Sequence, residues 1–306
     1  MQMLTHISMA HEALSKFKTT RRLLPAPLLQ VLGRAWLKAA VLRLELSRPD
    51  DVSVVIGLRN RADYRLVNAL KSIRMQTYPS DLVRILVVDY GSEAESAQRA
   101  QRICSEHRAD YLRVDHARVW SRSRCLNVGI RRAETKFVMA SDVDIVLSPR
   151  YLSDSVGVLT TSPLSVVCSA MLDLPQESAE ILERAARTGE VLQPDAWKEW
   201  CCPRYDWKEH PSICMTYTAL YKVIRGYDEH YQAWGSEDDD LLQRFTYLGL
   251  RRQTLDARSF YMHQWHADSD RGKDAEQTRR NESYFESNHS ILRNDDGWGV
   301  PPAMSR

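Results

Sequence analysis

The sequence predicts an α/β fold in which a mostly parallel central sheet is flanked by helices. In the first half of the chain, β-branched apolar runs of strand length alternate with stretches whose apolar residues recur at helical spacing. Acidic residues follow two of the predicted strands, at the strand ends where ligands bind in open α/β sheets. With 306 residues and 43% hydrophobic content, the chain is long enough to bury a sizeable core.

The alternation can be followed element by element. Strands are expected at 52–58, 82–88, 111–114 and 136–140, and helices at 62–75, 93–108 and 123–133. Strands that are joined through helices lie parallel, so their carboxyl ends meet at one edge of the sheet. The side chains of Asp89, Asp142 and Asp144 are therefore expected to share one crevice.

The regularity drops beyond Pro149. A helix is expected over 176–188, an aromatic-rich loop over 193–212, and a return to the sheet in the apolar stretch 215–224. The last forty residues are polar and show little apolar periodicity, which predicts a tail or lid.

The first fifty residues differ from the rest in charge, with eight Lys/Arg and three Asp/Glu against a net charge of +2 for the whole chain. The small overall charge does not indicate a nucleic-acid partner. Residues 23–46 include an amphipathic helical pattern with basic side chains, which fits either packing on the domain or peripheral contact with an anionic membrane surface. The uncharged stretch 23–33 is too short for a transmembrane helix, and the order of a secretory signal is not present.

Cysteine usage bears on the compartment. The six cysteines form no CxxC pair and no regular framework. This pattern predicts reduced thiols and a cytoplasmic protein, with peripheral attachment to the inner face of the membrane left open.

Two acidic motifs indicate a functional site. Residues 237–240 are four consecutive carboxylates that repel one another, which does not favour stability. The apolar residues that follow have helical spacing, so the run is placed at a helix N-terminus, where the macrodipole supports negative charge. An acidic first turn of an ordinary helix is the alternative. Asp142 and Asp144 end a predicted buried strand, and paired carboxylates suit Mg²⁺ or Mn²⁺ that carries a phosphate ligand.

These motifs, in this order, resemble the nucleotide-sugar-dependent glycosyltransferases of the GT-A fold. Residues 52–79 and the strand that ends at Asp89 are similar to the opening of glycosyltransferase family 2, although Tyr90 replaces the second acid of the usual Asp-Asp-Gly-Ser. Residues 226–240 are similar to the C-terminal half of galactosyltransferase-type enzymes, such as β-1,4-galactosyltransferases and chondroitin-polymerase-like enzymes. The resemblance covers about 52–266.

The resemblance implies a division of the chain. Residues 51–150 form the nucleotide-sugar-binding half and residues 151–266 the acceptor-binding and catalytic half. Residues 1–50 are then a basic helical extension, and residues 267–306 a tail or lid.

The resemblance also implies an activity. The chain is expected to move a sugar from a nucleoside-diphosphate sugar, of the UDP-Gal, UDP-GalNAc or UDP-Glc type, to a hydroxyl of a glycan or glycoconjugate, with inversion. Asp238 matches the catalytic base, and Glu237 is expected to bind a hydroxyl of the acceptor or donor. Crowding within the acidic run is expected to raise the pKa of one carboxyl group, which suits a base near neutrality.

The expected ligand contacts divide into two sets. The metal, Mn²⁺ or Mg²⁺, is expected on Asp144, Asp142 and one of His263 and His266, with His263 preferred. The nucleotide sugar is expected to contact Asp89, Arg59, Arg124, Asp142 and Trp234. In this set Asp89 contacts the nucleobase, Arg124 (with Arg122) the phosphates, and Trp234 stacks on a sugar.

Three alternatives remain open from the sequence. The first is a retaining transferase on the same fold, and the second is a catalytically inactive partner subunit that binds a sugar or nucleotide. The third is a nucleotidyltransferase or sugar-phosphate cyclase. That class requires a Gly-rich basic loop after the first strand, and residues 57–61 are a poor match for one.

Overall fold

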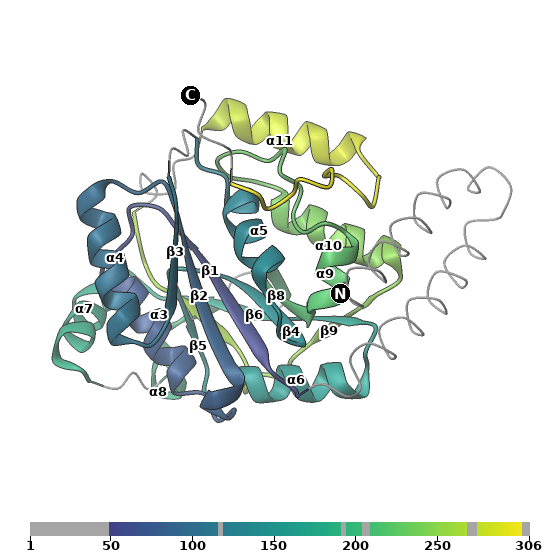
Figure 1. Cartoon of the computed structure of the whole chain (residues 1–306). Helices are drawn as coiled ribbons and strands as arrows, with labels where there is room; N and C mark the ends of the chain where they lie inside the picture. The colour runs from purple at the N-terminus through teal and green to yellow at the C-terminus, as the bar shows by residue number, and fades with distance from the viewer. Residues whose placement is uncertain (1–48, 116–118, 191–193, 204–208, 268–273, 302–306) are drawn as a thin grey trace, which may run out of the picture.

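The computed structural model describes residues 49–301, apart from 116–118, 191–193, 204–208 and 268–273. The predictions for residues 1–50, including the membrane contact of 23–46, therefore lie almost wholly outside the described residues. The described part of the chain forms one ten-stranded sheet with helices on both sides (Figure 1). The predicted α/β class is confirmed.

The bounds of the elements are as follows. The strands are β1 (Val52–Leu58), β2 (Val83–Tyr90), β3 (Asp110–Val114), β4 (Phe137–Asp142), β5 (Ile145–Leu147), β6 (Ser165–Asp173), β7 (Cys202–Pro203), β8 (Glu209–Tyr217), β9 (Arg251–Thr254) and β10 (Tyr261–His263). The helices are α3 (Tyr64–Arg74), α4 (Ala94–Glu106), α5 (Arg122–Arg132), α6 (Tyr151–Thr161), α7 (Ser178–Thr188), α8 (Pro194–Trp197), α9 (Thr218–Val223), α10 (Glu237–Leu248) and α11 (Ala275–Ser287). Two 3₁₀ turns are η1 (Ser80–Leu82) and η2 (Lys198–Trp200).

The first four strands form the parallel part of the sheet. The order along the sheet is β3-β2-β1-β4-β8-β6-β10-β5, with β7 and β9 also paired to β6. β1 pairs in parallel with both β2 and β4, and all seven of its residues are buried. A strand that is covered on both faces needs a continuous apolar run, which is the pattern found at 52–58.

Helix α5 packs closely on this parallel part. A Cβ at Gly129 would lie 2.4 Å from Cγ1 of Val55, so the glycine allows the helix to approach β1. Figure 1 shows α5, α9 and α10 on one side of the sheet and α3, α4 and α7 on the other. The fold therefore has three layers, with the sheet between two layers of helices.

The second half of the chain is less regular, and one prediction there is wrong in part. The apolar stretch 215–224 does not return to the sheet as one strand, because β8 ends at Tyr217 and α9 follows. Five of the six residues of α9 are buried, so burial extends around most of the helix and the apolar pattern does not separate helix from strand. The expected loop 193–212 also contains α8, η2, β7 and the start of β8.

The antiparallel strand β8 lies between β4 and β6 and joins the two halves of the sheet. On the far side of β6, β10 runs parallel to β6 and antiparallel to β5. These pairings bring the carboxyl end of β10 beside the carboxyl end of β6 and the start of β5.

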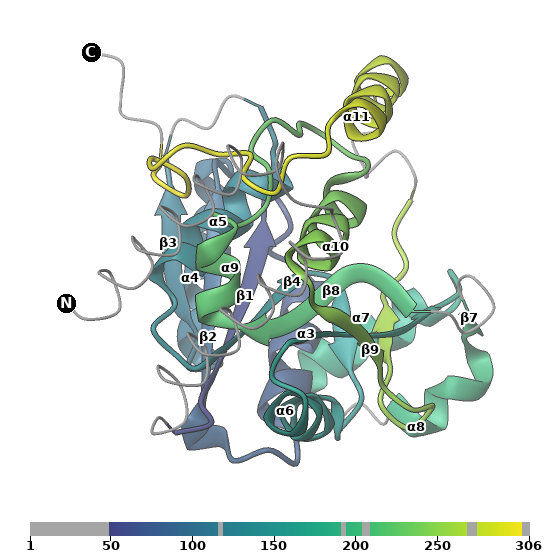
Figure 2. The ribbon, with the colours of Figure 1, turned by 90° about the vertical axis from the view of Figure 1, so that its right-hand side faces the viewer.

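The described part of the predicted tail or lid, residues 274–301, contains a helix and a segment that packs on the core. Helix α11 lies at the edge of the molecule, and the segment after it runs back across the top of α5 (Figure 2). Trp298 in this segment is buried and belongs to the main core. Among the described residues, no helix is long and apolar enough to cross a membrane.

Candidate active site

A cleft of about 700 Å³ opens beyond the carboxyl ends of β1 and β4. Its lining comes from both halves of the chain and consists of residues 57–61, Arg65, Trp120, Arg122, residues 142–145, Met171, Pro211, Ser212, residues 234–239, His263 and His266. The crevice expected for an open α/β sheet is therefore present, and the two acidic motifs meet in it.

Asp144, His263 and His266 form a compact cluster of potential metal ligands. Oδ2 of Asp144 lies 3.7 Å from Nε2 of His263 and 3.5 Å from Nε2 of His266. One ligand atom from each residue lies within 4.8 Å of the other two. Both histidines thus join Asp144, although the sequence alone expected only one of them to be a ligand.

The other ring nitrogen of each histidine is held by an acceptor. Nδ1 of His263 lies 3.0 Å from Oδ1 of Asp173, and Nδ1 of His266 lies 3.1 Å from the carbonyl oxygen of Ala267. A carbonyl and a carboxylate oxygen only accept, so each Nδ1 donates its hydrogen to them, and in the neutral ring Nε2 is then the nitrogen that can bind a cation. Orientation of this kind by outer partners is typical of metal-binding histidines.

The sheet register explains the position of Asp173. β10 pairs with β6 so that His263 lies opposite Asp173, and it pairs with β5 so that His263 lies opposite Ile145. Asp144 directly precedes β5. The carboxyl end of β10 therefore brings His263 beside a second candidate ligand, Asp144, and beside its own hydrogen-bond partner, Asp173. The donor set of two imidazoles and a carboxylate fits a divalent cation such as Mn²⁺.

Asp142 is engaged elsewhere. Nε of Arg122 donates to its Oδ1 over 2.5 Å, and Nη2 of Arg122 donates to its Oδ2 over 3.1 Å. Asp142 lines the cleft, but its carboxylate faces the guanidinium of Arg122, whereas Asp144 faces the two histidines.

The candidate base is bound to the same arginine. Nη1 of Arg122 donates to Oδ1 of Asp238 over 2.5 Å, and Nη2 of Arg122 donates to the carbonyl of Ser212 over 2.7 Å. Burial raises the pKa of Asp238 well above its usual range; Arg122 opposes this shift, and the neighbouring Glu237 adds to it. The expectation of a raised pKa within the acidic run agrees with this environment.

The turn before α10 holds an unusual backbone. Ala233, Gly235 and Ser236 have φ of 55°, 117° and 66°, which is the left-handed region. For Ala233 and Ser236 this conformation costs free energy and persists only where the surroundings enforce it. Oε2 of Glu237 accepts a hydrogen bond of 3.0 Å from the N–H of Gly235, and burial raises the pKa of Glu237.

The acidic run divides between two environments. Glu237, Asp238 and Asp239 line the cleft. Asp240 is fully buried and accepts hydrogen bonds from Nε of Arg244 over 2.6 Å and from Nη2 of Arg293 over 2.9 Å. Because α10 turns by about 100° per residue, consecutive carboxylates point in different directions.

The remaining predicted residues lie in different places. Arg59 and Trp234 line the cleft, and the Trp234 side chain is 44% exposed there. Asp89 is fully buried and accepts from the Tyr111 hydroxyl over 2.6 Å and from the Ser92 N–H over 2.9 Å. Its contacts are thus internal to the protein.

Arg124 lies outside the lining of the cleft. Its Nε donates to the carbonyl of Glu229 over 3.2 Å. Arg122, two residues earlier on α5, occupies the cleft instead. Sequence reasoning did not include Asp173. The signal that found Asp142, a carboxylate directly after an apolar run, is also present at 165–173.

Comparisons with known proteins agree with the observed fold. A family model described as "Glycosyltransferase like family 2" matches residues 53–263. No curated protein matches the chain.

The fold resembles solved structures at low identity. The crystal structure of Staphylococcus aureus TarS 1–349 has a TM-score of 0.51 at 19% identity, over 70% of this chain and 60% of that chain. The same TarS portion in complex with UDP has a TM-score of 0.52 at 17% identity, over the same shares. The mannosyltransferase PcManGT from Pyrobaculum calidifontis, in complex with GDP-Man and Mn²⁺, has a TM-score of 0.50 at 18% identity, over 84% of this chain and 68% of that chain. The chain thus spans about 60% of the TarS structures that it matches.

Proposed function

The chain belongs to the glycosyltransferase-like family 2, and on this basis we propose that it transfers a sugar from a UDP-sugar to a hydroxyl of a glycan or glycoconjugate, with a divalent cation as cofactor. One observation carries the proposal. The cluster of Asp144, His263 and His266 and the carboxylates of Glu237 and Asp238 line the same cleft. Sugar transfer needs a cation for the leaving diphosphate and a base for the acceptor hydroxyl, close together.

Two solved structures of similar fold support a nucleotide donor, since one TarS structure contains UDP and the mannosyltransferase structure contains GDP-Man and Mn²⁺. UDP is favoured over GDP by the resemblance of residues 226–240 to the galactosyltransferase-type half. In this proposal residues 51–150 bind the nucleotide sugar and residues 151–266 bind the acceptor.

The cation would be held by Asp144, His263 and His266. When bound there, a divalent cation supplies positive charge to the leaving diphosphate as a Lewis acid. The chain's own residues orient the substrates around it. Arg59 lines the cleft and adds positive charge for the phosphates, Arg122 holds Asp142 and Asp238 in place, and the exposed ring of Trp234 offers an apolar face for a sugar.

Asp238 is proposed as the general base. The acceptor oxygen attacks the anomeric carbon, the bond from that carbon to the diphosphate oxygen breaks with its electron pair on the diphosphate, and the acceptor proton passes to the Asp238 carboxylate. A single displacement of this kind inverts the anomeric configuration. A carboxyl group whose pKa is raised by burial is a stronger base than an exposed one. Glu237 binds a hydroxyl of one of the two sugars.

The test is thermal stabilisation by a panel of nucleoside diphosphates, each with and without Mn²⁺. We expect UDP to raise the Tm only when Mn²⁺ is present, and we expect Asp144→Ala to lose that shift. An absence of any shift with every nucleotide would reject the transferase proposal. A shift with GDP alone would retain the reaction and change the donor.

A further inference from the structure

The C-terminal segment that follows the family match contacts the turn that carries the candidate base. The family model ends at residue 263, whereas α11 begins at Ala275. A methyl carbon of Thr278 is the atom nearest to a Cβ built on Gly235, at 3.5 Å. Residues 275–294, called here the C-terminal clamp, therefore lie against the catalytic turn, residues 233–240.

Asn281 holds one side of this turn. It is buried, and its Nδ2 donates to the carbonyl of Gln232 over 2.9 Å and to the carbonyl of Trp234 over 3.1 Å. The two carbonyls flank Ala233, whose φ is positive. A single amide thus fixes the backbone on both sides of a residue whose conformation is unfavourable by itself.

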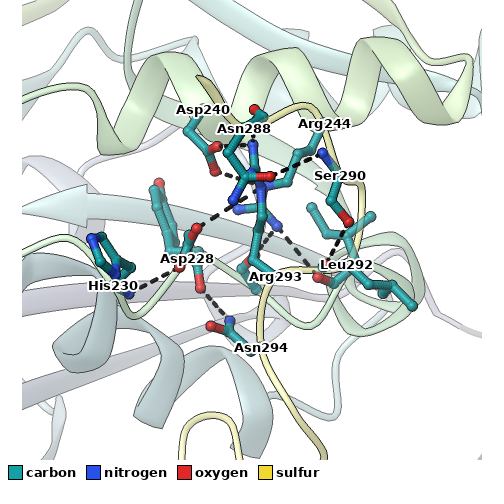
Figure 3. Close-up of polar contacts among 12 residues, drawn as sticks. Asp228, His230, Asp240, Arg244, Asn288, Ser290, Leu292, Arg293 and Asn294 are labelled. Carbon is teal, nitrogen blue, oxygen red and sulfur yellow. Dashed lines mark hydrogen bonds and ion pairs between the residues drawn. The ribbon is translucent and has the colours of Figure 1, made fainter. Parts of the chain in front are cut away.

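Arg293 holds the other side. Its Nη2 lies 2.9 Å from Oδ1 of Asp240, and its Nε lies 3.8 Å from Oδ2 of Asp228 (Figure 3). The Arg293 side chain is 1% exposed, and those of Asp228 and Asp240 are 3% and 0% exposed. Nη2 also donates to the carbonyl of Asn288 over 2.5 Å, so the arginine joins the clamp to the first turn of α10.

The buried charges around Arg293 balance. Asp240 also receives Nε of Arg244 over 2.6 Å, and the Tyr284 hydroxyl donates to Asp228 over 2.9 Å. The cluster thus contains two carboxylates and two guanidinium groups. Removal of one partner from such a buried set leaves an uncompensated charge, which is costly. Asp240 is two residues after Asp238 on the same helical turn, so a displacement of Asp240 displaces the base.

We propose that Arg293 and Asn281 are positioning residues, which hold the catalytic turn from its two sides and so set the placement of Glu237 and Asp238 in the cleft. The inference rests on the proposed function. It extends the active site to a segment that the family model does not include. Neither residue touches substrate in this proposal; both act through the turn.

The kinetic test uses the full chain and Mn²⁺-dependent hydrolysis of a UDP-sugar. We expect Arg293→Met and Asn281→Ala to lower kcat by about tenfold to a hundredfold, as for a misplaced catalytic group, with the donor KM changed by less than about twofold. In Arg293→Met/Asp240→Asn the buried charges balance again, but the link from the clamp to α10 is still absent. We therefore expect the Tm to return towards the wild-type value while kcat stays low. A loss of folded protein alone would instead give a kcat that returns together with the Tm. The matched control is Asp296→Asn, on the following segment, whose carboxylate pairs with Arg225 near the surface.

A second measurement needs no substrate. We expect faster amide hydrogen exchange across residues 233–242 in Arg293→Met and in Asn281→Ala, but not in Asp296→Asn. Unchanged exchange, or faster exchange with an unchanged kcat, would overturn the inference. Asn281→Ala keeps the buried charges balanced. If Arg293→Met does not fold, the kcat and the amide exchange of Asn281→Ala test the inference. If the wild type hydrolyses no nucleotide sugar, the proposed function fails, and exchange alone decides whether the clamp holds the turn.

Discussion

Nη1 of Arg122 lies 2.5 Å from Oδ1 of Asp238, and Nε of the same side chain lies 2.5 Å from Oδ1 of Asp142. Arg122 begins α5 in the first half of the chain, whereas Asp238 lies on α10 in the second half. One buried cation therefore connects the two halves at the cleft. Burial raises the pKa values of Asp238 and Glu237, and the charge of Arg122, which also pairs with Asp142, opposes both shifts only in part.

We expect Arg122→Met to destabilise the fold by up to about 3–5 kcal/mol, because it leaves two partly buried carboxylates without their cation. The measurement is urea unfolding near neutral pH. The matched control is Arg124→Met, two residues later on the same helix. Its side chain is 44% exposed and lies 3.9 Å from Glu229, so we expect a loss below about 1 kcal/mol. Equal losses for the two variants would contradict a central role for Arg122.

Asp238→Asn is expected to lower kcat by about 10²-fold to 10⁴-fold, because the acceptor hydroxyl loses its base. The Mn²⁺-dependent stabilisation by UDP should persist, since the residues of the cation cluster are unchanged. Asp239→Asn, the next cleft carboxylate, is the matched neighbour and should retain more activity. Loss of nucleotide binding in Asp238→Asn would assign Asp238 to the donor site instead.

The raised pKa of Asp238 has a consequence for stability. Between the ordinary carboxyl value of about 4 and the raised folded value, the folded protein holds a proton that the unfolded chain has released, so the free energy of unfolding falls as pH rises. Asp238→Asn removes this dependence. We expect the Tm of the variant relative to the wild type to increase as the pH rises above the ordinary carboxyl value. Parallel Tm curves would show that Asp238 has an ordinary pKa in the folded state.

The first half of the fold could be predicted from the sequence because local pattern and tertiary role agree there. The run 52–58 is apolar throughout and is a fully buried strand, and 123–133 has helical spacing and forms α5. In the second half of the chain, the local sequence pattern and the position of a segment in the fold disagree. The apolar segment 215–224 supplies both the end of β8 and all of α9, and only the partners of each residue decide between them.

The residues of the candidate site also divide into those that the sequence indicates and those that only the packing brings together. Asp144, Asp238 and the two histidines could be found because each stands in a motif of fixed spacing. Pairing of Asp240 with an arginine could be expected, but Arg293 could not be named as a partner, since it lies 53 residues away and only the packing of the C-terminal segment brings it close. For Asp89 and Arg124, the motif position alone does not determine what the side chain contacts. Their motif positions predict contacts to a nucleotide, whereas in the structure their side chains contact protein atoms.

His263→Ala and His266→Ala are each expected to abolish the dependence of UDP stabilisation on Mn²⁺, because the cluster of Asp144, His263 and His266 keeps only two ligands. The measurement is the Tm with UDP across a Mn²⁺ titration. His107→Ala is the matched control, since this histidine lies at the end of α4, away from the cleft lining. If one histidine variant kept the full shift, that residue would be excluded from the cation site.

Asp173→Asn tests whether the outer partner of His263 matters. The carboxylate of Asp173 lies 3.0 Å from Nδ1 of His263, where it holds the orientation of the ring. Loss of such a partner weakens metal binding by about 10–100-fold, so we expect the Mn²⁺ concentration at half-maximal UDP stabilisation to rise by that factor, with the maximal shift retained. The control is Asp110→Asn, at the exposed start of β3. A complete loss of the shift would make Asp173 a direct ligand, and an unchanged titration would show that the histidine is oriented by its strand alone.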